Sequence, residues 1–252
     1  MPNDLVQLGF EDSIAMIALN DPDRRNAMNI AMFDALDEAV RDVAVRNDVH
    51  VLLLHGKGKA FCSGFDLAAA VDDPTLMKQY IDRLSATIRT LRRLPQVVVG
   101  AVHGAAIAGG CAMVSACDIV VASATAKFGY PVHKLGVSPA VNITTLAQAI
   151  GPGPARSLLM SSELIDGTAV LRLGLAHRLV ETDDAVLDAA TSSCRTIAGH
   201  GPKALRVTKA WLNELDGSLD DDLFDGPRDG SAEIADSDEA VALLRQFRAG
   251  RK

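Results

Sequence analysis

Aromatic residues are scarce in this chain: Phe, Trp and Tyr make up 4% of its 252 residues, with a single tryptophan. Hydrophobic residues as a whole still reach 48%, so the core must be built mainly from Ala, Val, Leu and Ile. A chain of this length is typical of one large α/β domain with a small appendage, and it is short for two domains of equal size.

Cysteine is also rare, and the four cysteines are Cys62, Cys111, Cys117 and Cys194. No two of them have the C-x-x-C spacing of a metal or redox motif, so we predict no metal site. Without such a motif, they are expected to be reduced and mostly buried in a cytoplasmic protein. A nucleophilic Cys62 would need an adjacent base, and none is evident in the sequence.

Positive charge is not in excess. The chain has 25 Lys and Arg against 32 Asp and Glu, a net charge of −7, which argues against a nucleic-acid or anionic-membrane partner. No apolar run approaches the ~18 residues that a membrane-spanning helix needs, and no signal peptide is recognisable ahead of Asp4. We therefore expect a cytoplasmic protein with no nucleic-acid or membrane partner.

A glycine-rich stretch from Gly100 to Val121 is the feature around which the rest of the chain is arranged. An apolar run precedes it, the pair Gly109-Gly110 lies at the start of a short apolar helix, and a second apolar run follows Asp118. The first turn of a helix has N–H groups without intrahelical partners and carries the positive end of the helix dipole. This stretch therefore predicts a place that can bind a negative oxygen without a charged side chain.

Taken alone, these glycines also fit a tight crossing of strand and helix in which they serve only packing. The phosphate-loop and dinucleotide-binding patterns of glycine are absent. A second stretch, Gly56–Leu67, favours a functional interpretation, because it too follows an apolar strand and runs into a predicted helix.

Strands and helices alternate over the first half of the chain, which predicts a largely parallel sheet with helices packed on it. The second half has little strand signal. Its tail is expected to form helices over 184–198, 202–215 and 234–248, with residues 216–230 as a polar, acidic connector.

Several segments, in this order and spacing, resemble the crotonase family, also called the enoyl-CoA hydratase/isomerase superfamily. They include Asp23–Met28, Ala60–Leu67, Ala101–Asp118, Ala126–Gly129 and Gly174–Ala176. The resemblance covers nearly the whole chain. It implies an α/β fold, the crotonase-like ββα spiral with a helical C-terminal region. It also implies an acyl-CoA-binding core over 1–182, an oligomerisation or lid region over 183–252, and assembly into a homotrimer or homohexamer.

The resemblance further implies a substrate and a site. The substrate is an acyl-CoA thioester, and no cofactor is needed because coenzyme A is part of it. Two backbone N–H groups, assigned by motif position to Ser63 and Gly109, stabilise the enolate oxygen. The remaining substrate-binding positions are Arg25, Ala27, Ala60, Gly64, Asp66, Gly110, Ala112 and Val132.

The sequence departs from the family where hydratases carry two glutamates. Ala112 stands where the first is expected, two residues after the glycine pair, and Val132 stands where the second is expected after Phe128–Pro131. Neither side chain can move a proton. The aspartate nucleophile of the family's aryl-CoA dehalogenases would fall near Ala140, so it is absent as well.

His133 and Lys134 are the titratable groups nearest to the missing acids, and His133 is the candidate for a catalytic role. If this segment is extended, His133 should point away from the pocket that Val132 faces. Three functions stay open: a decarboxylase of a malonyl-type thioester, which needs no base; an isomerase or hydratase with relocated acid–base groups; and a non-catalytic acyl-CoA-binding or scaffold protein.

Overall fold

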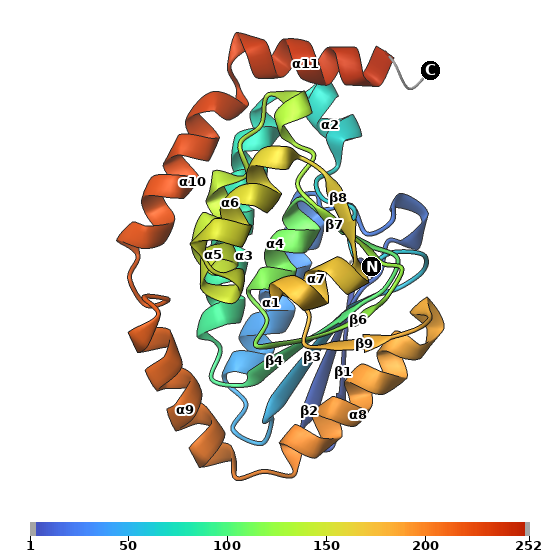
Figure 1. Cartoon of the computed structure of the whole chain (residues 1–252), viewed down its shortest axis with the longest axis vertical. Coiled ribbons are helices and arrows are strands. Elements are labelled where there is room, and N and C mark those ends of the chain that lie inside the picture. The colour runs from blue at the N-terminus through green and yellow to red at the C-terminus, as the bar shows by residue number, and fades with distance from the viewer. Residues whose placement is uncertain (1–3, 250–252) are drawn as a thin grey trace.

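A computed structural model describes residues 4–249 of the chain. Its larger sheet has the strand order β1-β2-β3-β4-β6-β9, shown in Figure 1. The strands are β1 (Val6–Glu11), β2 (Ile14–Leu19), β3 (Val51–Gly56), β4 (Val97–Val102), β6 (Ile119–Ser123) and β9 (Arg178–Val180). The β1–β2 hairpin is antiparallel and every other pair is parallel, as the alternation of strands and helices predicted.

Both faces of this sheet are covered, which explains why all six residues of β4 are buried. One face packs against α1 (Ile30–Ala44), α3 (Thr75–Arg93) and the short helix α4 (Gly109–Ser115). The other face packs against α8 (Val186–Ala198), whose buried residues join those of β3, β4 and β6 in one cluster. Because α8 completes the core, we place the start of a separate C-terminal region after it rather than at residue 183.

A second, three-stranded sheet has the order β5-β7-β8. It consists of β5 (Ala105–Ile107), β7 (Lys127–Gly129) and β8 (Leu164–Asp166). β5 lies inside the glycine-rich stretch, where the glycines on either side of it make a strand of three residues hard to recognise in the sequence. The first strand of this small sheet, β5, connects the end of β4 to the start of α4.

The C-terminal arm consists of α9 (Pro202–Leu215), α10 (Asp222–Ala235) and α11 (Asp238–Ala249), which wrap round one side of the molecule (Figure 1). The prediction of a polar connector over 216–230 was wrong, because α10 forms there despite Pro227 within it. Its apolar face, which includes Phe224 and Ala232, is buried.

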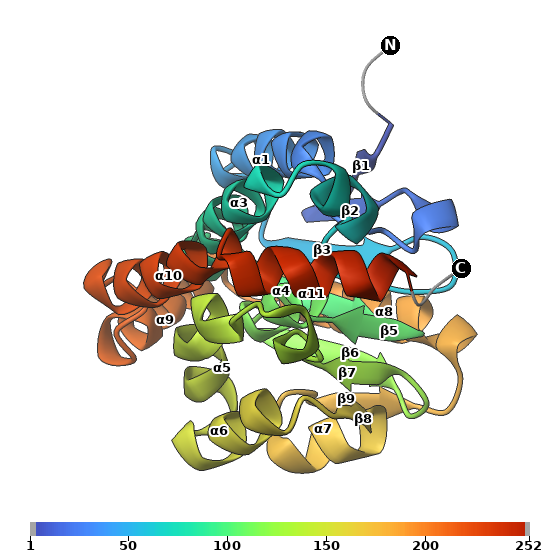
Figure 2. The same ribbon diagram turned by 90° about the horizontal axis from the view of Figure 1, so that it is seen from above.

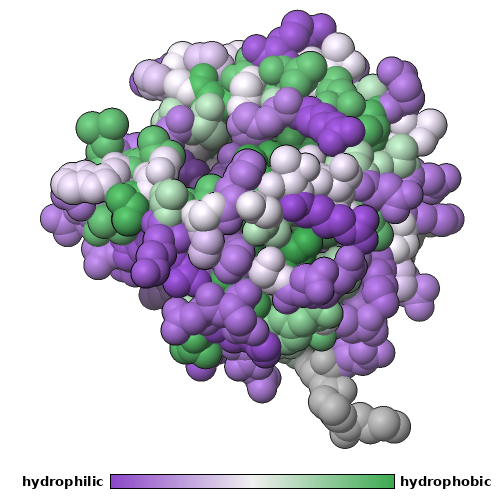
Figure 3. Space-filling model, turned by 90° about the horizontal axis from the view of Figure 1, so that it is seen from below, coloured by the Kyte–Doolittle hydropathy of each residue, from purple (hydrophilic) through white to green (hydrophobic). Residues whose placement is uncertain are grey.

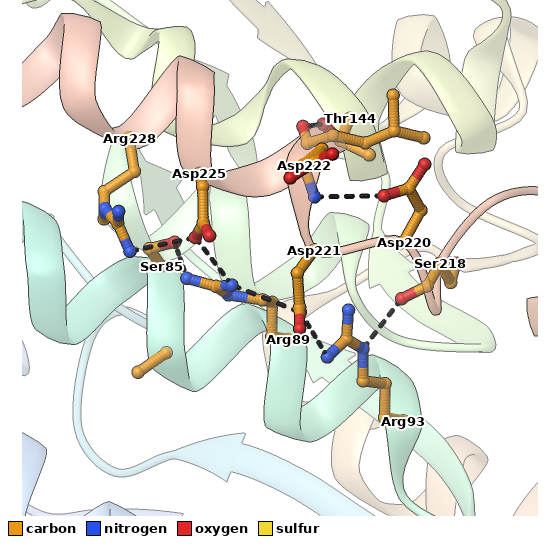
Figure 4. A network of polar contacts seen from close by, with 12 residues as sticks. Ser85, Arg89, Arg93, Thr144, Ser218, Asp220, Asp221, Asp222, Asp225 and Arg228 are labelled. Atoms are coloured by element: carbon orange, nitrogen blue, oxygen red, sulfur yellow. Dashed lines mark hydrogen bonds and ion pairs between the residues drawn. The ribbon is translucent and has the colours of Figure 1, made fainter.

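Ion pairs fix α10 on α3, as Figure 4 shows. Asp225 accepts from Arg89 at 2.9 Å, and Asp221 accepts from Arg93 at 2.8 Å. The aspartates that suggested a solvated connector thus have partners from a distant helix. Tertiary contacts of this kind outweigh a weak local helix propensity.

The last helix lies across the molecule, as Figures 1 and 2 show. α11 contacts α2 (Leu67–Asp72) and a 3-10 turn at His133–Leu135. Arg248 near its end forms an ion pair with Asp72. The remaining helices are α5 (Ile143–Ile150), α6 (Pro152–Ser161) and α7 (Gly167–Leu173). In the described part of the chain, no helix is long and apolar enough to cross a membrane.

Candidate active site

A cavity of about 300 Å³ lies where α3, α4 and α11 meet the loops after β3 and β7. Most of its wall is apolar. The apolar side chains are Phe65, Leu67, Met77, Ile81, Leu84, Ile107, Ala108, Ala112, Pro131, Val132, Leu135, Val137, Pro139, Val141 and Phe247. Its polar lining comes from Ser63, Tyr130, Lys134, Ser138 and Asn142.

Gly109 opens α4 on the wall of this cavity. As the first residue of the helix it has no intrahelical acceptor for its N–H, and none is found elsewhere among residues 4–249. A Cβ at this position would overlap the end of the Met28 side chain, which is fully buried. The glycine therefore lets Met28 pack against the backbone that carries the unpaired N–H.

The loop after β3 is held between two backbone segments. On one side Cys62 donates to Ala105 at 3.0 Å and accepts from Ile107 at 2.9 Å, so the loop extends the small sheet. On the other side Met28 donates to Gly64 at 2.8 Å and accepts from Asp66 at 2.9 Å. The second loop that the sequence singled out is thus fixed directly beside the first.

These bonds decide which N–H groups of the loop are available. The N–H of Ser63 donates to the carbonyl of Arg25 at 3.0 Å, and that of Gly64 is hydrogen-bonded to the thiol of Cys62. Met28 and Phe65 are paired as in a parallel sheet, so Met28 bonds to the residues on either side of Phe65. The N–H of Phe65 itself points away from Met28. Within the described residues, Phe65 N–H has no acceptor.

The assignment of the first donor to Ser63 therefore does not fit the hydrogen bonding of the loop. The unpaired donor is two residues further on, at Phe65, whose ring also lies beside Gly109: a Cβ built there would be 3.3 Å from Phe65 Cε1. Motif position alone could not distinguish the two residues. The informative signal was the pairing of Met28 with Phe65, which depends on the tertiary fold.

The two positions where the family has glutamates both face the cavity. Ala112 and Val132 line it, and no Asp or Glu is among its lining residues in the described part of the chain. That the site moves no proton through a carboxylate stays a prediction.

His133 does not line the cavity. Its segment is a 3-10 turn rather than an extended strand, and its Nδ1 lies 2.8 Å from Ser162 Oγ. The side chain thus faces away, as expected, although for a different backbone reason. Lys134 does line the cavity and has no ion-pair partner among residues 4–249. It is the single charged side chain of the lining within those residues.

A buried polar network lies beneath Ala112. Asn142 donates through Nδ2 to the hydroxyl of Tyr130, and its Oδ1 accepts from Ser115 and Thr145 at 2.8 Å each. Burial raises the pKa of Tyr130 well above 10, so its hydroxyl stays protonated at neutral pH. The network can orient a polar group, but it contains no base.

Charged residues gather where Asp23–Met28 meets the loop after β3. Asp66 caps α2 by accepting from Ala68 and Ala69, and its second oxygen accepts from Arg24 at 3.1 Å. Asp66 is therefore the N-cap of α2. Arg25 and Lys59 are exposed, and Lys57 is bound by Gln7.

The other predicted substrate-binding residues, Ala27, Ala60, Gly64 and Gly110, are buried in the walls of the two loops. Burial raises the pKa of Cys62 to about 12, which agrees with an inert thiol. No cluster of potential metal ligands is found in the described residues.

Comparison with known proteins identifies the family. The sequence profile described as enoyl-CoA hydratase/isomerase matches residues 9–220. The chain belongs to this family. It is 34% identical over 209 residues to a putative enoyl-CoA hydratase of Thermus thermophilus, covering 81% of this chain and 82% of the relative. It is 32% identical over 211 residues to the probable enoyl-CoA hydratase echA6 of Mycobacterium tuberculosis, covering 83% of this chain and 82% of the relative.

The fold is likewise that of the enoyl-CoA hydratase/isomerase family. The crystal structure of an enoyl-CoA hydratase/isomerase from Xanthobacter autotrophicus superposes with a TM-score of 0.88 and 25% identity, over 97% of this chain and 93% of that one. The expected crotonase-like α/β fold with a helical C-terminal region is thereby confirmed, and the family is one of acyl-CoA lyases and isomerases.

Proposed function

We propose that this protein binds an acyl-CoA thioester in the apolar cavity and polarises its carbonyl with the backbone N–H groups of Gly109 and Phe65. The observation that carries the proposal is the pair of unpaired donors on the wall of one mostly apolar cavity. Fixed donors in such a site stabilise a developing enolate strongly, because they need no reorganisation when the charge forms. Removing one donor of this kind typically costs about 3–4 kcal/mol of transition-state stabilisation.

The acyl group would occupy the cavity, and the nucleotide would lie outside it along the two loops. Exposed cations of the first loop, Arg24 and Arg25, together with Lys59, can offset part of the negative charge of CoA. The contacts we propose for substrate are those expected from the sequence: Arg25, Ala27, Ala60, Gly64, Asp66, Gly110, Ala112 and Val132. No cofactor is required, because CoA arrives with the substrate.

The reaction we propose is not the classical hydration of a 2-enoyl thioester. Hydration needs a base for water and an acid for the α-carbon, and Ala112 and Val132 supply neither. The cavity lining in the described residues contains no carboxylate that could replace them.

A malonyl-type decarboxylation is the reaction that this lining favours. The bond between the α-carbon and the carboxylate breaks, its electron pair enters the enolate, and CO₂ leaves uncharged. The enolate then takes a proton at the α-carbon from water or from the ammonium of Lys134, which lines the cavity. No base is needed at any step. Transfer of the carboxylate into a mostly apolar cavity also favours its conversion to neutral CO₂.

The test is a panel of CoA thioesters. Calorimetry with acetyl-CoA measures binding, and turnover is measured with crotonyl-CoA and methylmalonyl-CoA. The proposal expects binding, negligible hydration and release of CO₂ from methylmalonyl-CoA. Binding without any turnover would favour a non-catalytic acyl-CoA carrier, and hydration at an ordinary enzymatic rate would favour relocated acid–base groups. Absence of thioester binding would overturn the proposal.

A further inference from the structure

Asn26 is a fully buried amide in the loop before Met28. Both Arg25 and Asn26 have positive φ angles, 54° and 55°, a conformation that is uncommon for residues other than glycine, although asparagine tolerates it better than most. Such local strain persists only where surrounding contacts impose it. Here it directs the Asn26 side chain into the protein.

The side chain of Asn26 binds two separate segments. Its Nδ2 donates to the carbonyls of Lys57, Ala60 and Phe61 at 3.0, 2.8 and 3.1 Å. Its Oδ1 accepts from the N–H of Asp21 at 2.8 Å. One amide thus joins the first loop to the loop that leads into Ser63–Asp66. The three carbonyls share its two hydrogens, and without the amide they would be left with unmet hydrogen-bonding capacity in a buried place.

Gly56 shows that this space is reserved for the amide. A Cβ at position 56 would lie 2.8 Å from Asn26 Nδ2 and 2.5 Å from the carbonyl oxygen of Phe61. The φ angle of Gly56 is not positive, so its backbone does not require glycine. A side chain there would collide with the carbonyl oxygen of Ala60 as well, at 2.7 Å, so glycine is required where the amide meets two of its acceptors.

The contacts continue from Asn26 to the unpaired donor. The carbonyl of Asn26 accepts from the thiol of Cys62 at 3.1 Å, and the carbonyl of Arg25 accepts from Ser63 N–H. Met28 then pairs with Phe65. The position of Phe65 N–H relative to Gly109 is therefore set by the segment 25–28, and Asn26 fixes that segment to the start of the same loop.

We propose that Asn26 is the positioning residue of the oxyanion site: its amide holds the loop so that Phe65 N–H and Gly109 N–H point at one oxygen. This inference rests on the proposed function. Asn26 itself touches no substrate atom. Its loss should change the polarisation of a bound carbonyl more than the affinity for CoA, because a shift of about 1 Å in a donor can cost about 10²-fold in rate.

The test uses a chromophoric probe, a dimethylaminocinnamoyl thioester of CoA. Hydrogen bonding at its carbonyl oxygen draws charge along the conjugated chain and moves the absorption band to longer wavelength. The variants are Asn26→Ala, Asn26→Ser and Gly56→Ala. The matched control is Gln96→Ala, because Gln96 is another fully buried amide whose Nε2 donates to two carbonyls, Val43 and Arg46, in a different part of the chain.

We expect the wild-type protein to bind the probe with a red shift. Asn26→Ala and Gly56→Ala should bind it with most of that shift lost, Asn26→Ser should lie between because its hydroxyl can serve one carbonyl, and Gln96→Ala should keep the full shift. Fluorescence titration measures affinity in parallel.

Each outcome decides a separate point. A wild-type protein that binds the probe without a red shift contradicts the proposed function itself. A wild-type shift that Asn26→Ala and Gly56→Ala retain overturns only the role of Asn26. If circular dichroism shows all three variants unfolded while Gln96→Ala folds, Asn26 is a folding residue and the positioning role is rejected.

Discussion

The N–H of Ser63 donates to the carbonyl oxygen of Arg25 at 3.0 Å. This bond engages the donor that motif position had suggested and fixes the loop so that the next unpaired N–H is at Phe65. The carbonyl acceptor comes from a residue with positive φ, so the unusual backbone at Arg25 affects which N–H groups of the loop stay unpaired.

Gly109→Pro should strongly weaken thioester polarisation while the fold is retained. Proline is tolerated at the first position of a helix, and it removes the N–H itself. We expect turnover of any substrate to fall by about 10²–10³-fold, with circular dichroism unchanged. The added ring would displace Met28, so Met28→Ala is the control, and it should keep most activity. Full activity in Gly109→Pro would show that the oxygen is bound elsewhere.

Restoring the two acids should create hydration. In Ala112→Glu combined with Val132→Glu, both carboxylates would face the cavity that the native residues line. Each group that transfers a proton typically contributes 10²–10⁴-fold in rate, so we expect crotonyl-CoA hydration to rise by at least about 10²-fold. The absorbance of the conjugated thioester measures it. The control is Ala112→Gln combined with Val132→Gln, whose side chains have the same shape without the acids, and it should stay inactive. Activity in that control would refute the explanation that the missing acids prevent hydration.

The sequence was sufficient for most of the fold, because long elements have strong signals. Asn29, for example, is of a residue type preferred at helix N-caps, and its side chain accepts from Met32 N–H at 2.9 Å at the start of α1. α10 was missed, since both its buried apolar face and its ion pairs with Arg89 and Arg93 depend on packing against α3 (Figure 4). The absence of acids at Ala112 and Val132 was evident from spacing. The donor at Phe65 was not evident from the sequence, because an N–H can be recognised as unpaired only when the hydrogen-bond partners of the neighbouring backbone groups are known.

Stability should fall in mild acid through His177. Its Nδ1 accepts from Val120 N–H at 2.9 Å, which requires the neutral ring. Desolvation lowers the pKa of His177 from its ordinary value of 6.5, and burial does the same for His55. At pH values between the folded-state pKa of His177 and 6.5, the unfolded chain binds more protons than the folded chain. The unfolding free energy therefore rises with pH across that window, and this contribution to stability is lost as the pH falls through it.

Urea unfolding at about pH 5 and about pH 8 measures this dependence. His177→Asn keeps an acceptor for Val120 and removes the titration, so its stability should change less between the two pH values. If the unfolding free energy of His177→Asn depends on pH as steeply as that of the wild type, other groups cause the effect, and His55 is the first to examine.

The exposed face of α9 should bind another subunit. Val207, Trp211 and Leu215 lie four residues apart on one side of this helix and are 59%, 70% and 85% exposed. In Figure 3, apolar side chains also project on the left of the view, the side on which α9 lies in Figure 1. Contiguous exposed apolar surface of this kind typically marks a protein interface. We expect a homotrimer or homohexamer in solution, in agreement with the expectation from the family resemblance.

Light scattering on the wild type and on Trp211→Glu tests this assembly. A buried glutamate without a partner would oppose association, so the variant should shift toward smaller species as the protein is diluted. Thr196→Glu adds the same charge at an exposed polar position on α8 and should leave the assembly intact. A monomeric wild type at micromolar concentration would contradict the prediction. An assembled Trp211→Glu protein would move the interface away from α9, and α9 would then carry an apolar surface for a different partner.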